Sequence, residues 1–166
     1  MAQKINQKQN GGWYEELGRA TASGGTNPTT LSVSFTPKKY LKVMIVQHSG
    51  GSSLDSKLRF NSDSGNNYDW RIQENASADS GVNSQNGMQL GINSLDGMEA
   101  EIMIVNEAAF VKPCTGFLNF FSAGAGAIYR NVVGFKWNNA SVQISSVQLV
   151  AGTGSYKNGS ELIVLG

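Results

Sequence analysis

Charged side chains are scarce in this sequence. Asp, Glu, Lys and Arg make up 15% of the 166 residues, against about 25% in an average globular domain. The charges nearly cancel, since 13 basic residues stand against 12 acidic ones and leave a formal net charge of +1. A chain without a basic excess has little attraction for nucleic acid or for an anionic membrane surface. We therefore expect neither as a partner.

Cysteine and long apolar runs are also nearly missing. Cys114 is the only cysteine, which excludes an internal disulfide framework and a cysteine-rich zinc site. No run approaches the roughly 18 apolar residues of a membrane-spanning helix. Residues 1–12 are polar and lack the apolar segment of a secretory signal. We expect a soluble protein that is made in the cytoplasm without a signal peptide.

Turn-forming residues are abundant instead. The chain contains 20 glycines, and Ser and Asn are frequent as well. These residues favour short strands joined by tight turns, whereas surface helices are built mainly from Ala, Leu, Glu and Lys. Apolar and polar residues alternate in many short segments, for example at Leu31, Val33 and Phe35. This period of two is typical of half-buried strands and predicts an all-β protein.

The spacing of these segments predicts the architecture. About ten short strands at intervals of roughly 8 to 14 residues indicate a single-domain antiparallel β-sandwich of the jelly-roll type. Residues 13–166 would form this β-sandwich domain, because a chain of this length fits one domain with one core. Residues 1–12 cannot bury enough apolar area to offset their ordering entropy. They are expected to form a flexible N-terminal arm.

Residues 58–72 carry the clearest local signal. Two alternating apolar runs flank the polar residues 61–67, which predicts a β-hairpin. The second run contains Tyr68 and Trp70, and such large aromatic side chains predict that this hairpin nucleates the core. Residues 40–46 are almost continuously apolar, which predicts a central strand with both faces covered.

Three further segments carry specific predictions. Residues 73–87 contain almost no apolar surface and are expected to form the longest loop. Residues 98–105 fit either a strand or a helix, and their strict alternation after Gly97 favours a strand. A change in the phase of the apolar positions predicts a β-bulge at Ser145 and Ser146.

Candidates for catalysis are few. His48 could serve a catalytic triad with a serine, but no Gly-x-Ser-x-Gly turn is present. Cys114 could pair with His48 as a thiolate, yet a cysteine in an apolar run is usually a small packed residue. Gly124 and Gly126 are similar to the start of a dinucleotide-binding loop, but Tyr129 stands where the third glycine is required. We expect no enzyme.

One polar segment is loosely similar to a calcium-binding loop. Oxygen-bearing side chains alternate around a glycine, at Asn61, Asp63, Gly65, Asn67 and Asp69. An EF-hand loop requires a glutamate at its twelfth position, where this chain has Ile72. The same residue types also form turns by bonding their own backbone. The turn interpretation is favoured, and calcium stays open as the alternative.

Two other groups of side chains suggest binding. Glu99 and Glu101 could form a carboxylate pair, but on a strand both would lie on the solvated face. Trp13, Tyr129 and Tyr156 stand at the ends of predicted elements and could stack on sugar rings. Most aromatic residues of this chain have apolar neighbours two positions away, so burial in the core is the favoured interpretation. No catalytic, cofactor-binding or metal-binding residue is assigned.

Three pieces of the chain together resemble a known family. They are Trp-Tyr-Glu-Glu-Leu-Gly at residues 13–18, the segment from Leu58 to Tyr68, and Ala-Gly-Thr-Gly at residues 151–154 followed by Gly-Ser-Glu-Leu-Ile-Val-Leu-Gly at residues 159–166. The resemblance is to small β-sandwich structural proteins carried in the genomes of tailed bacteriophages, which are head-decoration or tail-associated virion components. It extends from Trp13 to the last residue. The shared pieces are strand and turn motifs, so no functional residue is carried over.

The resemblance implies a non-enzymatic virion structural protein on the surface of the phage particle. The first interpretation is a capsid decoration or cement protein that stabilises the head. Its partners would be the major capsid protein or other virion proteins, and a homo-oligomer, in particular a trimer, is expected because virion surfaces are symmetric. The alternative is a tail- or fibre-associated binding module that recognises a host surface glycan through residues 73–87 and the exposed aromatics.

Overall fold

The computed structural model describes residues 14–25, 27–49, 54–75, 77–93, 97–121 and 128–166. Over these residues the chain forms twelve strands and no helix. All strand pairs are antiparallel. The predicted all-β class is therefore confirmed, with two strands more than expected.

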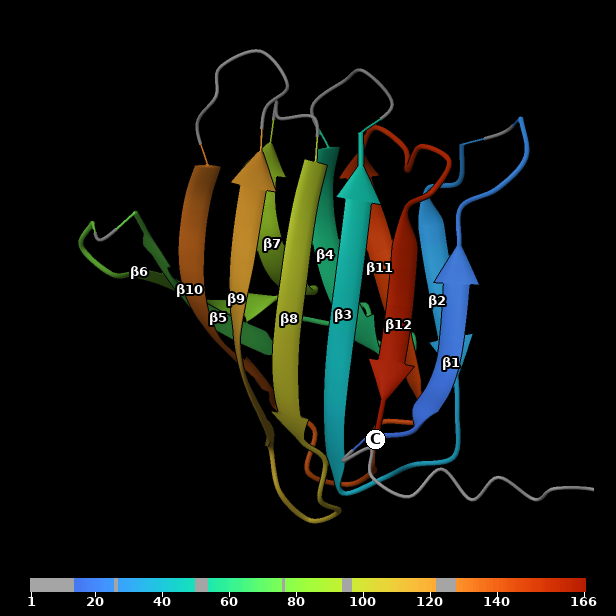
Figure 1. Cartoon of the computed structure of the whole chain (residues 1–166). Coiled ribbons are helices and arrows are strands. Elements are labelled where there is room, and N and C mark those ends of the chain that lie inside the picture. Colours follow the sequence, from blue (N-terminus) through green and yellow to red (C-terminus); the bar gives the residue numbers. More distant parts are fainter. Residues whose placement is uncertain (1–13, 26, 50–53, 76, 94–96, 122–127) are drawn as a thin grey trace, which may run out of the picture.

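The strands form two sheets that pack face to face (Figure 1). The larger sheet contains, in spatial order, β1 (Glu16–Thr21), β12 (Glu161–Leu165), β3 (Tyr40–His48), β8 (Gly97–Val105), β9 (Lys112–Phe121), β10 (Ile128–Trp137), β5 (Tyr68–Glu74) and β6 (Ser80–Gln85). The smaller sheet contains β2 (Thr30–Ser34), β11 (Ser146–Thr153), β4 (Leu54–Phe60) and β7 (Met88–Asn93). This arrangement confirms the β-sandwich. The chain crosses repeatedly between the sheets, and the jelly-roll topology stays a prediction.

The core fills the space between the sheets. Each strand contributes its inward alternates, such as Leu41, Val43 and Ile45 of β3, which are almost completely buried. The largest buried group is aromatic: the Trp137 ring lies 5.7 Å from the Phe60 ring and 6.4 Å from the Tyr68 ring, measured between centroids. The polar end of Tyr68 is satisfied, because its hydroxyl accepts a hydrogen bond from the Phe60 amide at 2.9 Å.

The predicted hairpin over residues 58–72 is wrong, although both of its strands exist. β4 pairs with β11 and β7, while β5 pairs with β10 and β6, so residues 61–67 lead the chain from one sheet to the other. The turn begins with two left-handed residues, Asn61 at φ 50° and Ser62 at φ 58°. Alternation identifies a strand and its buried face, but Phe60 and Tyr68 meet across the sandwich and not side by side.

Two other expectations about strands are also wrong. β3 is central, but only one of its faces is buried, since Tyr40 and Met44 are exposed on the other side. Residues 73–87 are not one loop, because β6 pairs along β5 as an edge strand. β6 could not be recognised from apolar residues, since its side chains are almost all exposed and its backbone alone makes the ladder.

Of the two remaining local predictions, one is confirmed and one is wrong. The preference for a strand over residues 98–105 is confirmed by β8, which begins at Gly97 and pairs with β3 and β9. The bulge at Ser145 and Ser146 is wrong, because β11 begins only at Ser146 and the residues before it form a loop. The phase of the apolar positions changes where that loop becomes a strand.

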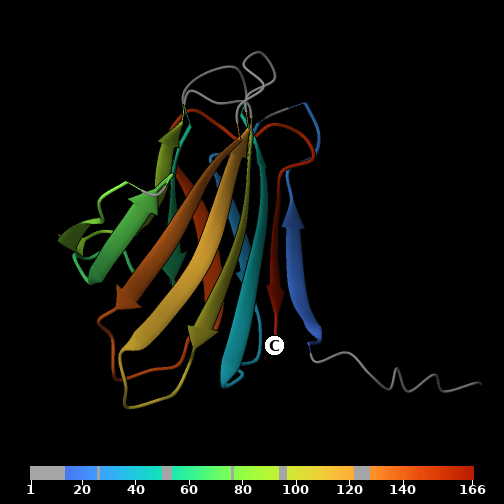
Figure 2. The same ribbon diagram turned by 60° about the vertical axis from the view of Figure 1, so that its left-hand side comes forward.

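The two ends of the described chain meet at the lower end of the sandwich in Figures 1 and 2. The Glu15 amide donates to the Gly166 carbonyl at 2.8 Å, and the Gly166 amide donates to the Glu15 carbonyl at 3.0 Å. Gly166 is closely surrounded, since a side-chain carbon at this position would lie 2.8 Å from Leu17 and 2.9 Å from Lys38.

Candidate functional site

Four loops gather at the lower end of the sandwich and are held together by buried polar groups. They comprise residues 35–39, 61–67, 106–111 and 138–145, and we call them the braced end (Figure 1). Asn106 is at the centre and is completely buried. Its side-chain amide donates to the Lys38 and Ile144 carbonyls at 2.9 and 3.0 Å, and its carbonyl oxygen accepts from the Ile144 amide at 2.6 Å. Asn106 therefore ties three of the four loops together.

Asn61 joins the fourth loop to this frame. Its side-chain amide donates to the Gln143 carbonyl at 2.9 Å, while its side-chain oxygen accepts from the Ser145 and Ser146 amides at 2.9 and 3.1 Å. A single asparagine can satisfy both donors and acceptors of a neighbouring backbone segment. The loop over residues 138–145 is thus fixed from two sides.

A buried lysine completes the frame. The Lys112 ammonium donates to the Phe110 carbonyl at 2.5 Å and to the Asn139 carbonyl at 2.9 Å, and it lies 5.9 Å from the centre of the Trp137 ring. Burial lowers the pKa of Lys112, because its charged form has lost its water. The ammonium holds two loops against each other through their carbonyl groups.

The possible calcium loop is closed by its own hydrogen bonds. The Asp63 carboxylate accepts from the Trp137 indole at 2.7 Å, from the Asn67 side chain at 2.9 Å and from the Gly65 amide at 2.9 Å. Burial opposes ionisation here, but these hydrogen bonds keep the pKa of Asp63 below its usual value. Among the residues that the structure describes, no group of three or more His, Cys, Asp or Glu could hold a metal ion. The observed contacts favour the turn interpretation.

The braced end presents apolar side chains to the outside. Phe110 is 63% exposed, and Val111 and Val142 are also exposed, on the two loops that Lys112 joins. Ala109, which precedes Phe110, has a left-handed backbone with φ 65°. A residue with a side chain is unusual in this conformation, and such strain is typical of segments with a role beyond folding.

The outer face of the eight-stranded sheet is a second candidate. Met44, Phe117 and Val132 lie on one cross-strand row and are all exposed. A hollow of about 400 Å³ lies beside Phe117, over β3, β8, β9 and β12. A second hollow of about 560 Å³ lies over β5, β9 and β10, with Gly134 in its lining. Glu101 of the same row stands between Met44 and Phe117, so the adjoining apolar residues are Phe117 and Val132. Exposed apolar surface of this kind is typical of protein interfaces.

Ion pairs surround the apolar row on this face. Lys42 pairs with Glu101 at 2.8 Å, and Lys136 pairs with Asp69 at 2.9 Å. Hydrogen bonds from Asn138 and Lys136 lower the pKa of Asp69 to about 2. The predicted carboxylate pair of Glu99 and Glu101 does lie on the solvated face of β8, where both side chains are exposed.

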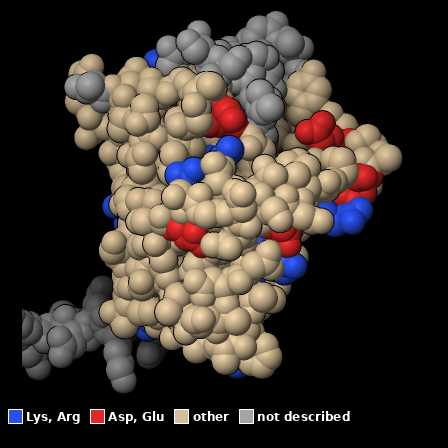
Figure 3. Space-filling model, turned by 180° about the vertical axis from the view of Figure 1, so that it is seen from behind, with Lys and Arg blue, Asp and Glu red and all other residues tan. Residues whose placement is uncertain are grey.

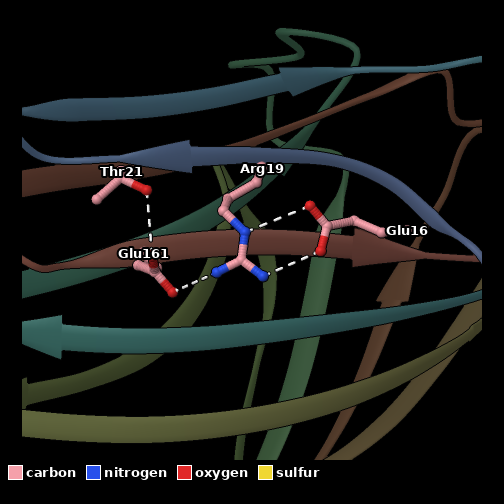
Figure 4. A network of polar contacts seen from close by, with 4 residues as sticks. All are labelled: Glu16, Arg19, Thr21 and Glu161. Atoms are coloured by element: carbon pink, nitrogen blue, oxygen red, sulfur yellow. Dashed lines mark hydrogen bonds and ion pairs between the residues drawn. The ribbon is translucent and has the colours of Figure 1, made fainter.

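At the edge of the same sheet, Arg19 lies between two carboxylates (Figure 4). Its guanidinium donates to Glu16 at 2.9 and 3.3 Å and to Glu161 at 2.7 Å. Thr21 donates to the other Glu161 oxygen at 3.2 Å. The hydrogen bonds from Arg19 lower the pKa of Glu16. This exposed network joins β1 to β12 across the sheet edge.

The outer face of the four-stranded sheet is different in character (Figure 3). The exposed alternates of β2 are Thr30, Ser32 and Ser34, and β11 and β7 add Gln148 and Gln89. Seen from this side, most of the surface is uncharged. Among the described side chains of this face, hydroxyl, amide and charged groups predominate, and such groups form hydrogen bonds with water.

The residues considered for catalysis are not brought together. His48 lies at one end of β3, where its backbone exchanges hydrogen bonds with the Ser160 hydroxyl. Cys114 lies near the other end of the sheet, opposite Ile104, and is buried. Burial raises the pKa of the Cys114 thiol, because the thiolate would lose its water. Cys114 is a packed core residue, as predicted.

The aromatic residues considered for sugar binding have separate environments. Tyr156 is completely buried, and its hydroxyl lies 3.3 Å from that of Ser56, which donates to Gln47 at 2.6 Å. Its burial agrees with the favoured interpretation, since this loop residue fills the core from the end of the sandwich. Tyr129 is exposed. Trp13 and the Gly124–Gly126 segment lie outside the described residues.

The sequence analysis did not identify Asn61, Asn106 or Lys112. Asn61 was considered only as a calcium ligand, and Asn106 was one amide among many. Lys112 offered a partial signal, because it occupies an inward position in the alternation of β9, where an apolar residue is expected. A polar residue at an apolar position of a strand is the pattern that could have pointed to this frame.

Comparison with known proteins adds no relative. Among the described residues, no helix has the length and hydropathy that crossing a membrane requires. No protein family model, curated protein or solved structure matches the chain. The functional interpretation therefore depends on the braced end and on the two outer faces.

Proposed function

We propose that this chain is a non-enzymatic structural protein of a phage virion that decorates the capsid and stabilises the head. The observation that carries this proposal is the braced end, where exposed Phe110, Val111 and Val142 are mounted on buried Asn106 and Lys112. The resemblance of three chain segments to phage virion proteins supports the same role. The major capsid protein is the proposed partner.

A rigid frame under exposed apolar residues favours binding to a large surface. Loops that are already fixed lose little conformational entropy on association, so more of the contact free energy remains for affinity. A protein that binds only the assembled shell stabilises it by mass action, by about 2.7 kcal/mol per site at a hundredfold excess over Kd. Repetition over a symmetric head multiplies this effect, and a trimer matches a three-fold site.

The experiment is co-sedimentation of the purified chain with heads of its phage that were assembled without it. We expect Phe110→Asp and Val142→Asp to lower the bound fraction at least tenfold, because each places a charge in an apolar contact. Val82→Asp is the matched control, because Val82 is also an exposed apolar residue but lies on the edge strand β6. Unchanged binding of the Phe110 variant, or no binding of the wild-type chain, would reject the proposal.

The N-terminal arm is tested separately. Tyr14 and Glu15, the first residues that the structure describes, lie at the same end as the braced loops. Deletion of residues 1–12 is expected to weaken binding to heads. Equal binding of the shortened chain would remove the arm from the interface and leave the role of Phe110 intact.

The glycan-binding alternative retains one observation. Tyr129 is exposed at the start of β10, at the end of the sandwich opposite the braced loops. A tail or fibre module would lose retention on host polysaccharide with Tyr129→Ala and would keep it with Phe110→Asp. The capsid proposal expects the reverse pattern, with binding to heads as the affected property.

A further inference from the structure

Two unpaired charges face solvent on the outer face of the eight-stranded sheet. Glu99 of β8 and Arg130 of β10 both lie opposite Asn119 of β9, so the three residues form one cross-strand row. Lys42, Glu101, Lys136 and Asp69 on the same face are already in ion pairs. Within the described part of the chain, the side chains of Glu99 and Arg130 make no ion pair or hydrogen bond.

The acid and the base are placed symmetrically about β9. Each lies one strand away from it, so their backbones are separated by about 10 Å, which is too far for direct contact within the chain. On β9 itself, the next outward residue is Phe117, which is 54% exposed. When one copy is rotated by 180° about an axis that runs along β9, its Glu99 comes to lie opposite Arg130 of the unrotated copy.

We propose that a second copy of this chain docks on this face, with the symmetry axis of the assembly along β9. Glu99 of each copy then meets Arg130 of the next copy, and the Phe117 rings gather at the axis. A rotation of 180° about this axis closes an isologous dimer, in which each contact is made twice. The contact does not depend on a virion role or on the trimer of the proposed function.

The shape of the face matches this symmetry. Met103 of β8 and Gly134 of β10 both lie opposite Thr115 of β9, one on each side of the axis. A side-chain carbon built at Gly134 would meet no atom within 4 Å, and the hollow of about 560 Å³ lies over it. Met103 is half-buried, with the Tyr14 hydroxyl 3.8 Å from its sulfur, and its thioether side chain is adaptable. The rotation places Met103 of one copy over the Gly134 hollow of the next.

The face is also large enough. The six strands from β12 to β5 contain five to ten residues each. At about 3.3 Å per residue and about 4.8 Å between strands, they cover roughly 800 Å². A stable protein interface buries about 800 Å² on each partner. The apolar centre of this face, its charged flanks and its area are all compatible with the docking of a second copy.

The test is the native mass of the full chain and its variants, measured by light scattering and native mass spectrometry at micromolar concentration. The wild-type chain is expected to be an oligomer of the 17.7 kDa subunit. Glu99→Arg or Arg130→Glu alone places like charges opposite each other and should raise the dissociation constant roughly tenfold or more. The double variant restores opposite charges, keeps the formal net charge of +1 and should recover the wild-type mass.

Three further variants separate this contact from other effects. Phe117→Asp should give a monomer with an unchanged circular dichroism spectrum. Lys157→Glu, at an exposed residue outside the face, is the charge-reversal control and should keep the wild-type mass. Phe110→Asp should lose binding to heads and keep the oligomer, which distinguishes failure of the capsid contact from failure of self-association.

Three outcomes would overturn the proposal. The first is a wild-type chain that stays monomeric at 100 μM, roughly a hundredfold above the micromolar Kd of a weak specific complex. The second is a pair of single charge variants that keep the wild-type mass, and the third is a double variant that stays dissociated.

Discussion

Two regions of the molecule depart from the usual distribution of side chains in opposite ways. The braced end buries polar residues, whereas the outer face of the eight-stranded sheet exposes apolar ones. At the braced end, Asn106 and Lys112 are completely buried and bind backbone carbonyls. On the outer face, Met44, Phe117 and Val132 are exposed to solvent. The first arrangement fixes loops that have no sheet ladder of their own. The second leaves apolar area uncovered, which contributes little to folding and is available for the proposed self-association.

The outer face of the four-stranded sheet makes this difference clear. Its strands show the same alternation of buried and exposed residues, yet the exposed positions of β2 are Thr30, Ser32 and Ser34. Both outer faces are compatible with the same sandwich core. Hydroxyl groups at Phe117 and Val132 would therefore be compatible with the same fold, and the proposed docking of a second copy would give these apolar residues a role.

The largest effect is expected for Asn106→Ala. The substitution leaves the Lys38 and Ile144 carbonyls and the Ile144 amide without the partners that they have in the wild-type chain. Each unsatisfied buried group costs about 1–3 kcal/mol, so the free energy of unfolding should fall by about 3–5 kcal/mol. Urea denaturation measures this change. Gln143→Ala, which removes one bond to the Asn106 carbonyl, is the matched control and should cost about 1 kcal/mol.

Lys112→Met should lower the free energy of unfolding by about 2 kcal/mol at pH 7, because two buried carbonyls lose their donor. The comparison also depends on pH. The pKa of Lys112 is lowered in the folded state from its ordinary value of 10.5, so between these two values the unfolded chain binds more protons. Wild-type stability relative to Lys112→Met should therefore rise as the pH increases toward 10.5. A constant difference between pH 8 and 11 would contradict the burial of a charged ammonium.

Ala109→Gly should raise the free energy of unfolding by about 0.5–1 kcal/mol. Ala109 has φ 65°, and glycine adopts this left-handed backbone without the steric cost of a side chain, although it has more entropy to lose on folding. Thermal denaturation would show a small increase in Tm. Destabilisation by this substitution would mean that the methyl group of Ala109 contributes packing that outweighs its backbone strain.

Phe117→Ser should have the smallest effect on folding. An exposed side chain outside the core changes the free energy of unfolding by no more than about 0.5 kcal/mol, provided that the measurement is made on the dissociated chain. At concentrations where the oligomer forms, the same substitution should abolish it. A loss of several kcal/mol in the monomer would show that the apolar row supports the fold itself.

Much of the fold could be predicted from the sequence, because burial on one face leaves a period of two. β2 and β8 follow from this pattern. The partners of the strands did not follow, since alternation states which face is buried and says nothing of the neighbouring strand. The turn at Asn61 and Ser62 is compatible with a hairpin or a crossover, and only the packing of Phe60 against Tyr68 and Trp137 decides between them.

The candidate site was less predictable for a different reason. An asparagine that bonds three backbone groups and an asparagine in solvent have the same local sequence, and the partners of Asn106 are 38 and 68 positions away. β6 was hidden because an edge strand with exposed side chains carries no apolar pattern. Conversely, Tyr156 looked peripheral in a loop rich in glycine and serine, and it is buried because that loop folds over the end of the sandwich.

The paired backbones of Glu15 and Gly166 have a practical consequence. Since these residues exchange two hydrogen bonds, a short linker can join them, and the chain can be reopened elsewhere as a circular permutant. Lys157 and Asn158 lie at the opposite end of the sandwich and are exposed, so a break between them keeps β11 and β12 complete. Such a permutant would carry a fused peptide far from the braced end, and it could display cargo on a surface while Phe110 remains free to bind.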